Sequence, residues 1–446
     1  MVRPPTPPGH WLWGNLPEVR RDMPQALRDV TAVHGGLTRL RMGPASMYLL
    51  AEPDLIHEVL VTRAAEFRKS NRTRQSIGWH LGDGLVTLEG AAHRRHRRIM
   101  QPSLHTQRVA AQADTIVALA EQRVASWPPG SEQDLLSEMA DLTLRIVCAA
   151  LFDLRPAEDE RLIAAVHDFA ASLNWATGRA FPLPRWLPSA GNRRAREIIN
   201  TLNTQVYALI ARRRATAAAG ADLLSMLLAA RDADTGAPLS DVEIRDELMT
   251  VFFAGHETSA AALTWALHLL DAHPDVMERL REELGDGPVT MADLPRLPLL
   301  LRVVKEVLRL YPPAWLFDRS PLTDLRLGGY DLPRGATLLV SPWVVHRDPR
   351  WWDAPDEFRP DRFADEPSRG HYFPFGDGPR LCVGNRFAET EIALVLATIV
   401  RRVALVRADA PAGRSMLLRP AGEATLRPGV RLRVTVTPVS EAGNGA

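Results

Sequence analysis

The chain has 446 residues, 46% of them hydrophobic, and its 54 Lys and Arg against 53 Asp and Glu give a net charge of +1 at pH 7. That length can bury a large core, and the absence of a basic excess argues against nucleic acid as a partner. Only two cysteines are present, Cys148 and Cys382. A disulfide scaffold and a cysteine-built zinc or iron–sulfur cage are therefore excluded, and a reducing compartment is favoured.

The N-terminal segment from Met1 to Asn15 is rich in proline and contains no apolar run of signal-peptide or membrane-span length. We therefore expect an extended leader without a transmembrane anchor, and a cytoplasmic protein. No Gly/Ser linker or low-complexity stretch divides the chain, so we expect a single domain over residues 1–446.

Strands are predicted in only a few places. The stretch from Leu37 to Leu50, interrupted by Gly43-Pro44, is typical of a hairpin, and residues 325–340 predict a second pair of short strands. Apolar residues alternate with polar ones from Val430 to Thr437, which predicts a strand with one buried face. Helices and short loops are predicted from about Leu104 to Leu310. The expected fold class is mainly α with a small β-rich lobe.

A long helix is predicted from Ser240, where Ser240-Asp-Val-Glu243 has the spacing of a capping box, to about Ala272 before Pro274. Its middle reads Phe253-Ala254-Gly255-His256-Glu257-Thr258. Glycine and a β-branched threonine are unfavourable inside a helix. The threonine hydroxyl can bond a carbonyl one turn earlier and open a pocket for dioxygen or water. The alternative is an ordinary amphipathic helix with a tolerated glycine.

His256 in this segment lies about 200° around the helix from Thr258. We therefore expect it to be a packing or hydrogen-bonding residue. Further along the chain, Glu306 and Arg309 are three residues apart on one helical face and can form an ion pair. On an exposed helix such a pair contributes little.

The stretch from Phe375 to Gly384 reads Phe-x-x-Gly-x-Arg-x-Cys-x-Gly, with a chance frequency on the order of one in ten thousand for a chain of this length. Glycines let such a loop turn tightly and approach a bound group closely. Loop amides and the helix expected near Asn385 would stabilise the Cys382 thiolate. Cys148, in an apolar helical run, is expected to be core packing.

This loop resembles the haem-binding loop of the cytochrome P450 family, and the resemblance extends over nearly the whole chain. It implies the P450 fold, a triangular helical prism around a buried haem b. Residues 1–70 and 315–345 would contribute much of the β-rich lobe, and residues 75–310 and 385–405 would be mostly helical. No fused reductase is expected, because nothing follows Ala446 and no cysteine set exists for a cluster.

The implied activity is that of a haem-thiolate monooxygenase that inserts one atom of O2 into a lipophilic substrate by hydroxylation or epoxidation. Its two electrons would come from a separate ferredoxin or flavodoxin with its reductase, and the protein would be a monomer. Two alternatives stay open. One is a peroxide-driven haem enzyme, which is disfavoured because such members usually lack the Glu257-Thr258 pair. The other is a haem-thiolate sensor without turnover.

The resemblance also implies roles for individual residues. Residues 254–258 match the family pattern Ala/Gly-Gly-x-Asp/Glu-Thr, in which Thr258 would donate to the distal oxygen and Glu257 would connect the proton supply to bulk water. The implied haem contacts are the metal ligand Cys382, the loop and helix residues Phe375, Gly378, Gly384, Ala254 and Gly255, and the propionate partners His93, Arg97, Arg319 and Arg380. Glu306, Arg309 and Arg362 would form a buried supporting triad, with Arg359 competing for the third position.

The implied substrate pocket is apolar, which suits an apolar substrate. Its expected residues are Trp79, Leu85, Phe253, Ala254, Ala314, Trp315 and Leu316, although any single aromatic could equally be core packing. A lid is expected from Phe169 to Leu187, with Trp175, Phe181 and Trp186. Arg380 and the segment from Glu357 to Phe363 favour the fatty-acid, terpenoid or carotenoid hydroxylating bacterial members. Arg94, Arg95 and Arg98 form either a solvated charged face or a docking patch for an acidic electron donor.

Overall fold

The computed structural model describes residues 2–155, 159–177, 186–216, 222–232, 236–368, 370–408 and 418–439. The chain divides into two compact units, each built from separate stretches of sequence. The first unit comprises Met1–Ser76, Lys305–Cys382 and Pro420–Arg427, and the second comprises Ile77–Val304, Val383–Arg419 and Pro428–Ala446. The expectation that residues 1–446 form one domain stays a prediction.

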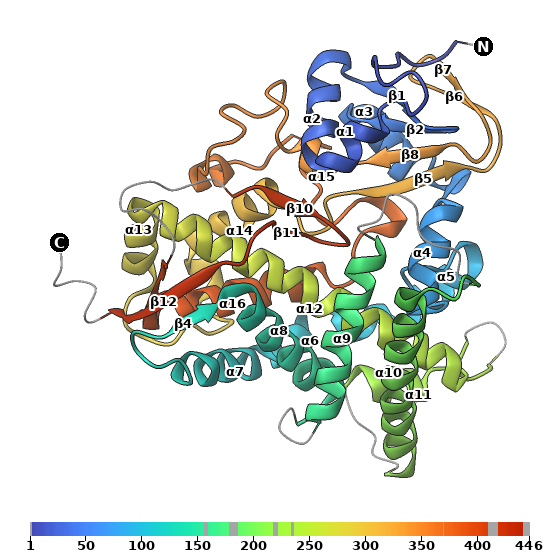
Figure 1. Cartoon of the computed structure of the whole chain (residues 1–446). Helices are drawn as coiled ribbons and strands as arrows, with labels where there is room; N and C mark the ends of the chain where they lie inside the picture. Colours follow the sequence, from blue (N-terminus) through green and yellow to red (C-terminus); the bar gives the residue numbers. More distant parts are fainter. Residues whose placement is uncertain are drawn as a thin grey trace. The chain divides into compact units, whose positions relative to one another are not determined.

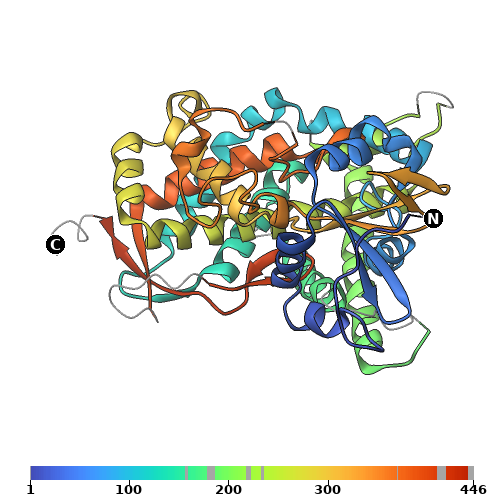
Figure 2. The same ribbon diagram turned by 90° about the horizontal axis from the view of Figure 1, so that it is seen from above.

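The first unit contains a five-stranded sheet in the order β1-β2-β8-β5-β3. Its strands are β1 (Leu37–Met42), β2 (Ala45–Leu50), β3 (Phe67–Arg68), β5 (Phe317–Pro321) and β8 (Thr337–Val340). The predicted hairpin is confirmed: β1 and β2 pair antiparallel from Leu37 opposite Leu50 to Met42 opposite Ala45, and Gly43 takes a positive φ of 63° in the turn. This hairpin is blue in Figure 2. Strand β8 pairs parallel with β2 and antiparallel with β5.

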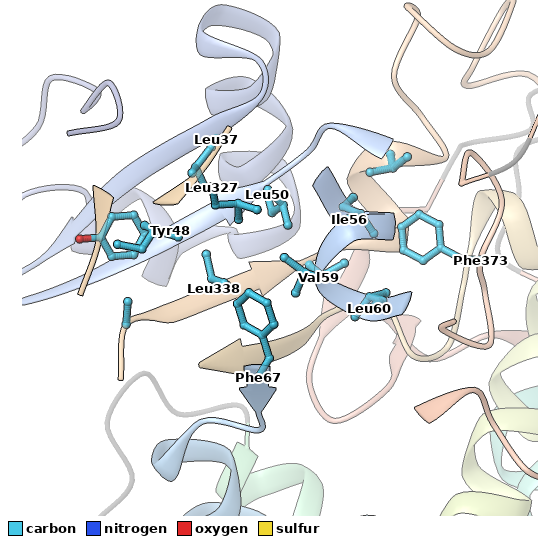
Figure 3. Close-up of a cluster of buried hydrophobic side chains, with 14 residues drawn as sticks. Leu37, Tyr48, Leu50, Ile56, Val59, Leu60, Phe67, Leu327, Leu338 and Phe373 are labelled. Carbon is cyan, nitrogen blue, oxygen red and sulfur yellow. The ribbon is translucent and has the colours of Figure 1, made fainter. Parts of the chain in front are cut away.

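Two further strand pairs belong mainly to this unit, β6 (Leu325–Leu327) with β7 (Tyr330–Leu332), and β10 (Pro420–Gly422) with β11 (Leu426–Pro428). The helices α1 (Leu16–Arg21), α2 (Met23–His34), α3 (Pro53–His57) and α15 (Pro342–Val345) complete it, and the chain passes between the units within α4 (Asn71–Leu81) and α14 (Pro298–Leu310). Apolar side chains of the sheet and of residues 56–60 form one core cluster. Figure 3 shows Phe373 beside Ile56 in this cluster, so the segment that precedes the Cys382 loop is anchored in the core.

The second unit is mostly helical. Its helices are α5 (Gly90–Met100), α6 (Thr106–Ala111), α7 (Ala113–Ala125), α8 (Leu135–Phe152), α9 (Glu160–Thr177), α10 (Ala190–Ala215), α11 (Leu223–Ala229), α12 (Asp241–Ala272), α13 (Pro274–Leu284) and α16 (Asn385–Arg402). None of the helices in the described part of the chain is long and apolar enough to cross a membrane.

The long helix α12 is the centre of this unit and packs against α8, α9, α10 and α16 (Figure 1). Its predicted capping box is present: the Ser240 hydroxyl accepts from the Glu243 backbone N–H, and the Glu243 carboxylate accepts from the Ser240 N–H. The buried residues in its second half occur on all sides, as expected for a helix surrounded by neighbours.

A three-stranded sheet, β4 (Glu132–Asp134), β12 (Arg433–Pro438) and β9 (Val403–Arg407), flanks these helices, with β12 in the middle. The strand predicted from Val430 starts only at Arg433, and Val430 is exposed. The partner strands set this limit, because Asp134 and Arg407 lie opposite Arg433 and Val434 and neither strand continues further. Strand β4 itself lies in a stretch predicted to hold only helices and loops.

Candidate active site

The loop that carries Cys382 is built by backbone hydrogen bonds within the first unit. The Cys382 N–H donates to the Phe375 carbonyl at 2.9 Å, and the Gly376 N–H donates to the Phe373 carbonyl at 3.0 Å. Gly378 has a positive φ of 66°, and a Cβ there would lie 2.1 Å from the Leu60 carbonyl oxygen. Only glycine therefore fits this position. Cys382 is exposed at the end of the turn, three residues before α16 begins at Asn385.

Cys148 has a very different environment. It lies in α8, is fully buried, and burial raises the pKa of its thiol to about 12. A thiol with that pKa stays protonated near neutral pH and is a poor metal ligand. The expectation that Cys148 is core packing agrees with this position.

A buried ionic cluster lies beside the loop in the first unit. Arg309 forms two bonds with Glu306, from Nε to Oε2 at 2.7 Å and from Nη2 to Oε1 at 2.9 Å, and neither side chain is exposed. Arg362 Nε reaches Glu306 Oε1 at 3.0 Å. Arg359 gives Glu306 only its backbone N–H, at 2.8 Å, while its guanidinium pairs with the exposed Asp353. The third side chain at Glu306 is thus that of Arg362.

Arg309 and His346 connect this cluster to the Cys382 loop. Arg309 Nη1 donates to the His346 carbonyl at 2.7 Å, and the His346 ring accepts from the Phe373 N–H through Nε2 at 2.9 Å. Burial lowers the pKa of His346 to about 3, so the ring is neutral and can accept this bond. No site role is predicted for His346 from sequence. The one local feature that could have pointed to it is its position in the segment His346-Arg-Asp-Pro349.

On α12 in the second unit, the Thr258 hydroxyl donates to the Ala254 carbonyl at 2.7 Å, the bond anticipated from sequence. The helix is nevertheless continuous from Asp241 to Ala272. Gly255 faces Val147 of α8, where a Cβ would lie 3.0 Å from a methyl group. Glu257 accepts from Asn174 Nδ2 of α9 at 3.1 Å.

The four predicted propionate partners lie on three elements. His93 is buried and Arg97 is partly exposed, both on α5 of the second unit. In the first unit, Arg319 is nearly buried on β5, where its Nη1 donates to the Asp318 carbonyl at 2.7 Å, and Arg380 is half-buried in the Cys382 loop. Each unit by itself therefore contains cationic or histidine side chains of the kind that carboxylates bind.

The predicted pocket residues divide into two groups. Ala314 is exposed, and Trp79, Phe253, Ala254 and Leu316 are partly exposed. Leu85 and Trp315 are buried. The Trp315 ring packs on Gly422 and its N–H donates to the Glu423 carbonyl at 3.1 Å. The Trp315 ring therefore supports the β10–β11 turn, and its expected role in the pocket stays a prediction.

The predicted lid is seen only in part. Trp175 packs on Gly191, Trp186 is exposed, and Phe181 lies outside the described residues.

Three arginines of α5, Arg94, Arg95 and Arg98, border a surface pocket of about 460 Å³ in the second unit, which Met226, Ala230 and Arg231 also line. Arg95 is committed to ion pairs with Asp232 at 2.6 Å and Glu243 at 2.5 Å, and the Glu243 hydrogen bond raises the pKa of its guanidinium. Arg94 and Arg98 are exposed. Of the three arginines in the predicted patch, Arg95 is therefore structural.

The sequence profile of one protein family, described as Cytochrome P450, matches residues 4–412. The chain belongs to the cytochrome P450 family. Cyclooctatin synthase of Streptomyces melanosporofaciens is 39% identical over 410 residues, which cover 89% of this chain and 88% of that protein. Pentalenene oxygenase of Streptomyces avermitilis is 36% identical over 418 residues, which cover 91% of each protein. The crystal structure of the cytochrome P450DA haem domain aligns with a TM-score of 0.88 at 27% identity and covers 98% of both chains.

These findings confirm the predicted P450 fold, with its mainly helical architecture and small β-rich lobe. This P450 is a haem-thiolate monooxygenase, which uses cysteine-ligated haem b and O2 together with electrons from a redox partner to oxidise a lipophilic substrate. The chemistry of the Cys382 loop suits that cofactor, because an exposed thiol stands on a loop that a glycine at position 378 keeps compact.

Proposed function

We propose that this P450 hydroxylates or epoxidises a cyclic terpenoid hydrocarbon, with Cys382 as the haem ligand and Glu257 and Thr258 as the proton-delivering pair. The observation that carries the assignment of the ligand is the contrast between the two cysteines. Cys382 is exposed on the glycine-containing loop, whereas Cys148 is buried with a raised thiol pKa.

Bound haem, once reduced, would activate dioxygen for insertion into a C–H or C=C bond. The chain's own residues would hold it and protect the thiolate. Phe375, Gly378 and Gly384 of the loop and Ala254 and Gly255 of α12 are proposed as haem contacts, and His93, Arg97, Arg319 and Arg380 as partners of its propionates. The buried Glu306, Arg309 and Arg362 cluster, through His346, would keep the loop in one conformation.

Thr258 and Glu257 would move protons. The Thr258 hydroxyl, which donates to the Ala254 carbonyl in this structure, can redirect its proton toward an oxygen acceptor by rotation about its Cβ–Oγ1 bond. The Glu257 carboxyl group, held by Asn174, would then supply protons to the threonine. In this arrangement the Thr258 hydroxyl would donate to the reacting oxygen, and Glu257 would pass protons from solvent to Thr258.

The substrate class is inferred from likeness to the relatives named cyclooctatin synthase and pentalenene oxygenase, together with the apolar character of Trp79, Leu85, Phe253 and Leu316. Titrating the ferric protein with cyclic terpene hydrocarbons should displace water from the iron and shift the Soret band. A straight-chain fatty acid should give a weaker shift at equal concentration. A shift with fatty acids alone would contradict the substrate class and leave the monooxygenase assignment intact.

A ferredoxin or flavodoxin with its reductase is proposed as the electron donor, docking at the exposed Arg94 and Arg98. A monomeric state and a cytoplasmic location stay predictions. Turnover with a reconstituted ferredoxin or flavodoxin and its reductase distinguishes the monooxygenase from a peroxide-driven enzyme and from a sensor, because only the monooxygenase forms product from O2 and reductant.

The ligand assignment is tested by replacing Cys382 with Ser. The variant should lose the red-shifted Soret band of the reduced carbonyl complex, because a neutral oxygen ligand lacks the electron donation of a thiolate. Cys148→Ala is the matched control and should keep the band. Retention of the band in Cys382→Ser would show that Cys382 is not the ligand.

A further inference from the structure

A fully buried histidine adjoins the proposed acid on α12. The His256 side chain has no exposed surface, and its Nδ1 is hydrogen-bonded to the Phe252 carbonyl. A carbonyl can only accept, so Nδ1 carries the proton and Nε2 is the acceptor of the neutral ring. Among the described residues Nε2 has no hydrogen-bond partner, and it lies 3.9 Å from Glu257 Oε1. The unsatisfied nitrogen thus faces a carboxyl group with which it can exchange a proton.

A second histidine, His167, lies between the His256–Glu257 pair and the surface. His167 of α9 has its ring centroid 5.9 Å from that of His256, with the two planes at 86°. Its Nε2 lies 3.6 Å from Asp141 Oδ1 of α8, and 34% of its side chain is exposed. Exposure therefore falls from His167 to the fully buried His256, which adjoins Glu257.

Neighbouring groups hold both ends of this arrangement in place. Asp141 Oδ2 pairs with Arg145 Nε at 2.8 Å and also with Arg123, so Oδ1 is the oxygen turned to His167. At the inner end, Asn174 Nδ2 donates to Glu257 Oε2 at 3.1 Å, and Oε1 is the oxygen turned to His256.

Both rings are neutral at rest mainly because burial lowers the pKa of both His167 and His256. For His167, Glu257 of α12 and Asp168 of α9 oppose this shift, while Arg145 of α8 and Arg123 of α7 add to it. For His256, Glu257 opposes the shift and His167 adds to it. Each ring would therefore bind a proton only in passing, as a relay requires.

We propose that His167 and His256 form a relay that carries solvent protons to Glu257. The relay would begin at the partly exposed ring of His167, beside Asp141. This inference rests on the proposed roles of Glu257 and Thr258. The reaction RH + O2 + 2e⁻ + 2H⁺ → ROH + H2O takes its electrons from the redox partner and its two protons from solvent. In each transfer His167 passes a proton taken from solvent to His256 Nε2, Nε2 passes it to Glu257 Oε1, and Glu257 gives a proton toward Thr258. The 3.9 Å between Nε2 and Oε1 is longer than a direct hydrogen bond, so a bridging water would complete this transfer.

The test uses His167→Gln and His256→Gln in the haem-loaded protein with its electron donor. Each variant should lower product formed per electron consumed and enlarge the solvent isotope effect on turnover. The rate loss should be about two- to tenfold, less than the roughly 10²–10⁴-fold contribution of a general acid in direct contact. The double variant should be no worse than the worse single variant, because the two residues act in series.

Peroxide-driven turnover, RH + H2O2 → ROH + H2O, needs no net proton from solvent and should be unchanged in both variants. His105→Gln changes an exposed histidine elsewhere in the same unit and should leave every readout unchanged. His167→Glu retains a titratable group and should recover part of the coupling. Equal losses in electron-driven and peroxide-driven turnover would show that the histidines only pack, and would overturn the relay.

Failure of the relay and failure of the proposed function give different results. If Thr258→Ala and Glu257→Gln uncouple the reaction while the two histidine variants leave coupling and isotope effect unchanged, the relay is wrong and the function stands. If Thr258→Ala and Glu257→Gln also leave coupling unchanged, the proposed proton-delivering pair is wrong as well.

Discussion

At the scale of single residues, Thr258 carries the chemistry that is simplest to isolate. Thr258→Ala should leave haem content and substrate binding nearly intact but divert reduced oxygen to hydrogen peroxide, because the hydroxyl is needed only after dioxygen binds. Product per electron consumed is the measurement. Thr264 is the matched control, since its hydroxyl makes the same bond to Ala260, at 2.7 Å, one helical turn and a half further along α12. Unchanged coupling in Thr258→Ala would return this residue to a structural role.

A second prediction at this scale concerns Glu391 and the pH dependence of stability. It is fully buried on α16, accepts from the Ser259 hydroxyl at 2.5 Å, and burial raises its pKa from 4.5 to about 8. Below pH 4.5 both folded and unfolded chains hold the proton, so the group does not alter stability. Between pH 4.5 and 8 the unfolded chain releases a proton that the folded chain keeps. The free energy of unfolding should then fall by at most about 1.4 kcal/mol per pH unit.

Glu391→Gln mimics the protonated acid and should remove this part of the pH dependence. In chemical denaturation from pH 5 to 8, the free energy of unfolding of the variant should rise relative to that of the wild type as pH increases. A constant difference between the two proteins across that range would contradict the prediction.

At the scale of elements, the link between α14 and the loop of residues 353–362 depends on one arginine rather than its neighbour. Arg362→Ala should lower the free energy of unfolding by about 3 kcal/mol, because it leaves the fully buried Glu306 with one fewer cationic partner. Arg359→Ala should cost less than about 1 kcal/mol, since its side chain pairs only with Asp353 at the surface. Denaturant titration and retention of haem during gel filtration measure both effects. Equal losses would show that the two arginines share the role.

Elements also show where sequence patterns stop being sufficient. The capping box and the glycine–threonine segment each consist of residues only a few positions apart, so α12 could be predicted with its ends. The start of β12 depended on where β4 and β9 end, which no local pattern in residues 430–437 encodes. The contact of the Trp315 ring with Gly422 joins segments about a hundred residues apart, so no local pattern predicts it.

At the scale of the whole molecule, the prediction concerns the redox partner. Arg94→Glu with Arg98→Glu should slow reduction by an acidic ferredoxin, and the wild-type rate should fall with added salt, because exposed charges are screened within about 10 Å at 0.1 M ionic strength. Peroxide-driven turnover should be unaffected. Arg193→Glu with Arg194→Glu makes the same change of charge on exposed residues of α10 and serves as the control. Equal slowing in both double variants would indicate an effect of net charge rather than a docking site.

The sequence by itself determined the family, the haem cofactor and the elements that carry the chemistry, because these rest on motifs whose residues are neighbours along the chain. The Cys382 loop, the Glu257-Thr258 pair and the Glu306–Arg309 pair are all of this kind. Only the tertiary structure decided that Arg362 joins Glu306 and that His167 lies against His256, which are 56 and 89 positions apart. Such pairs form because the packing of separate elements brings them together in the interior, where a polar group must find its partner or remain unsatisfied.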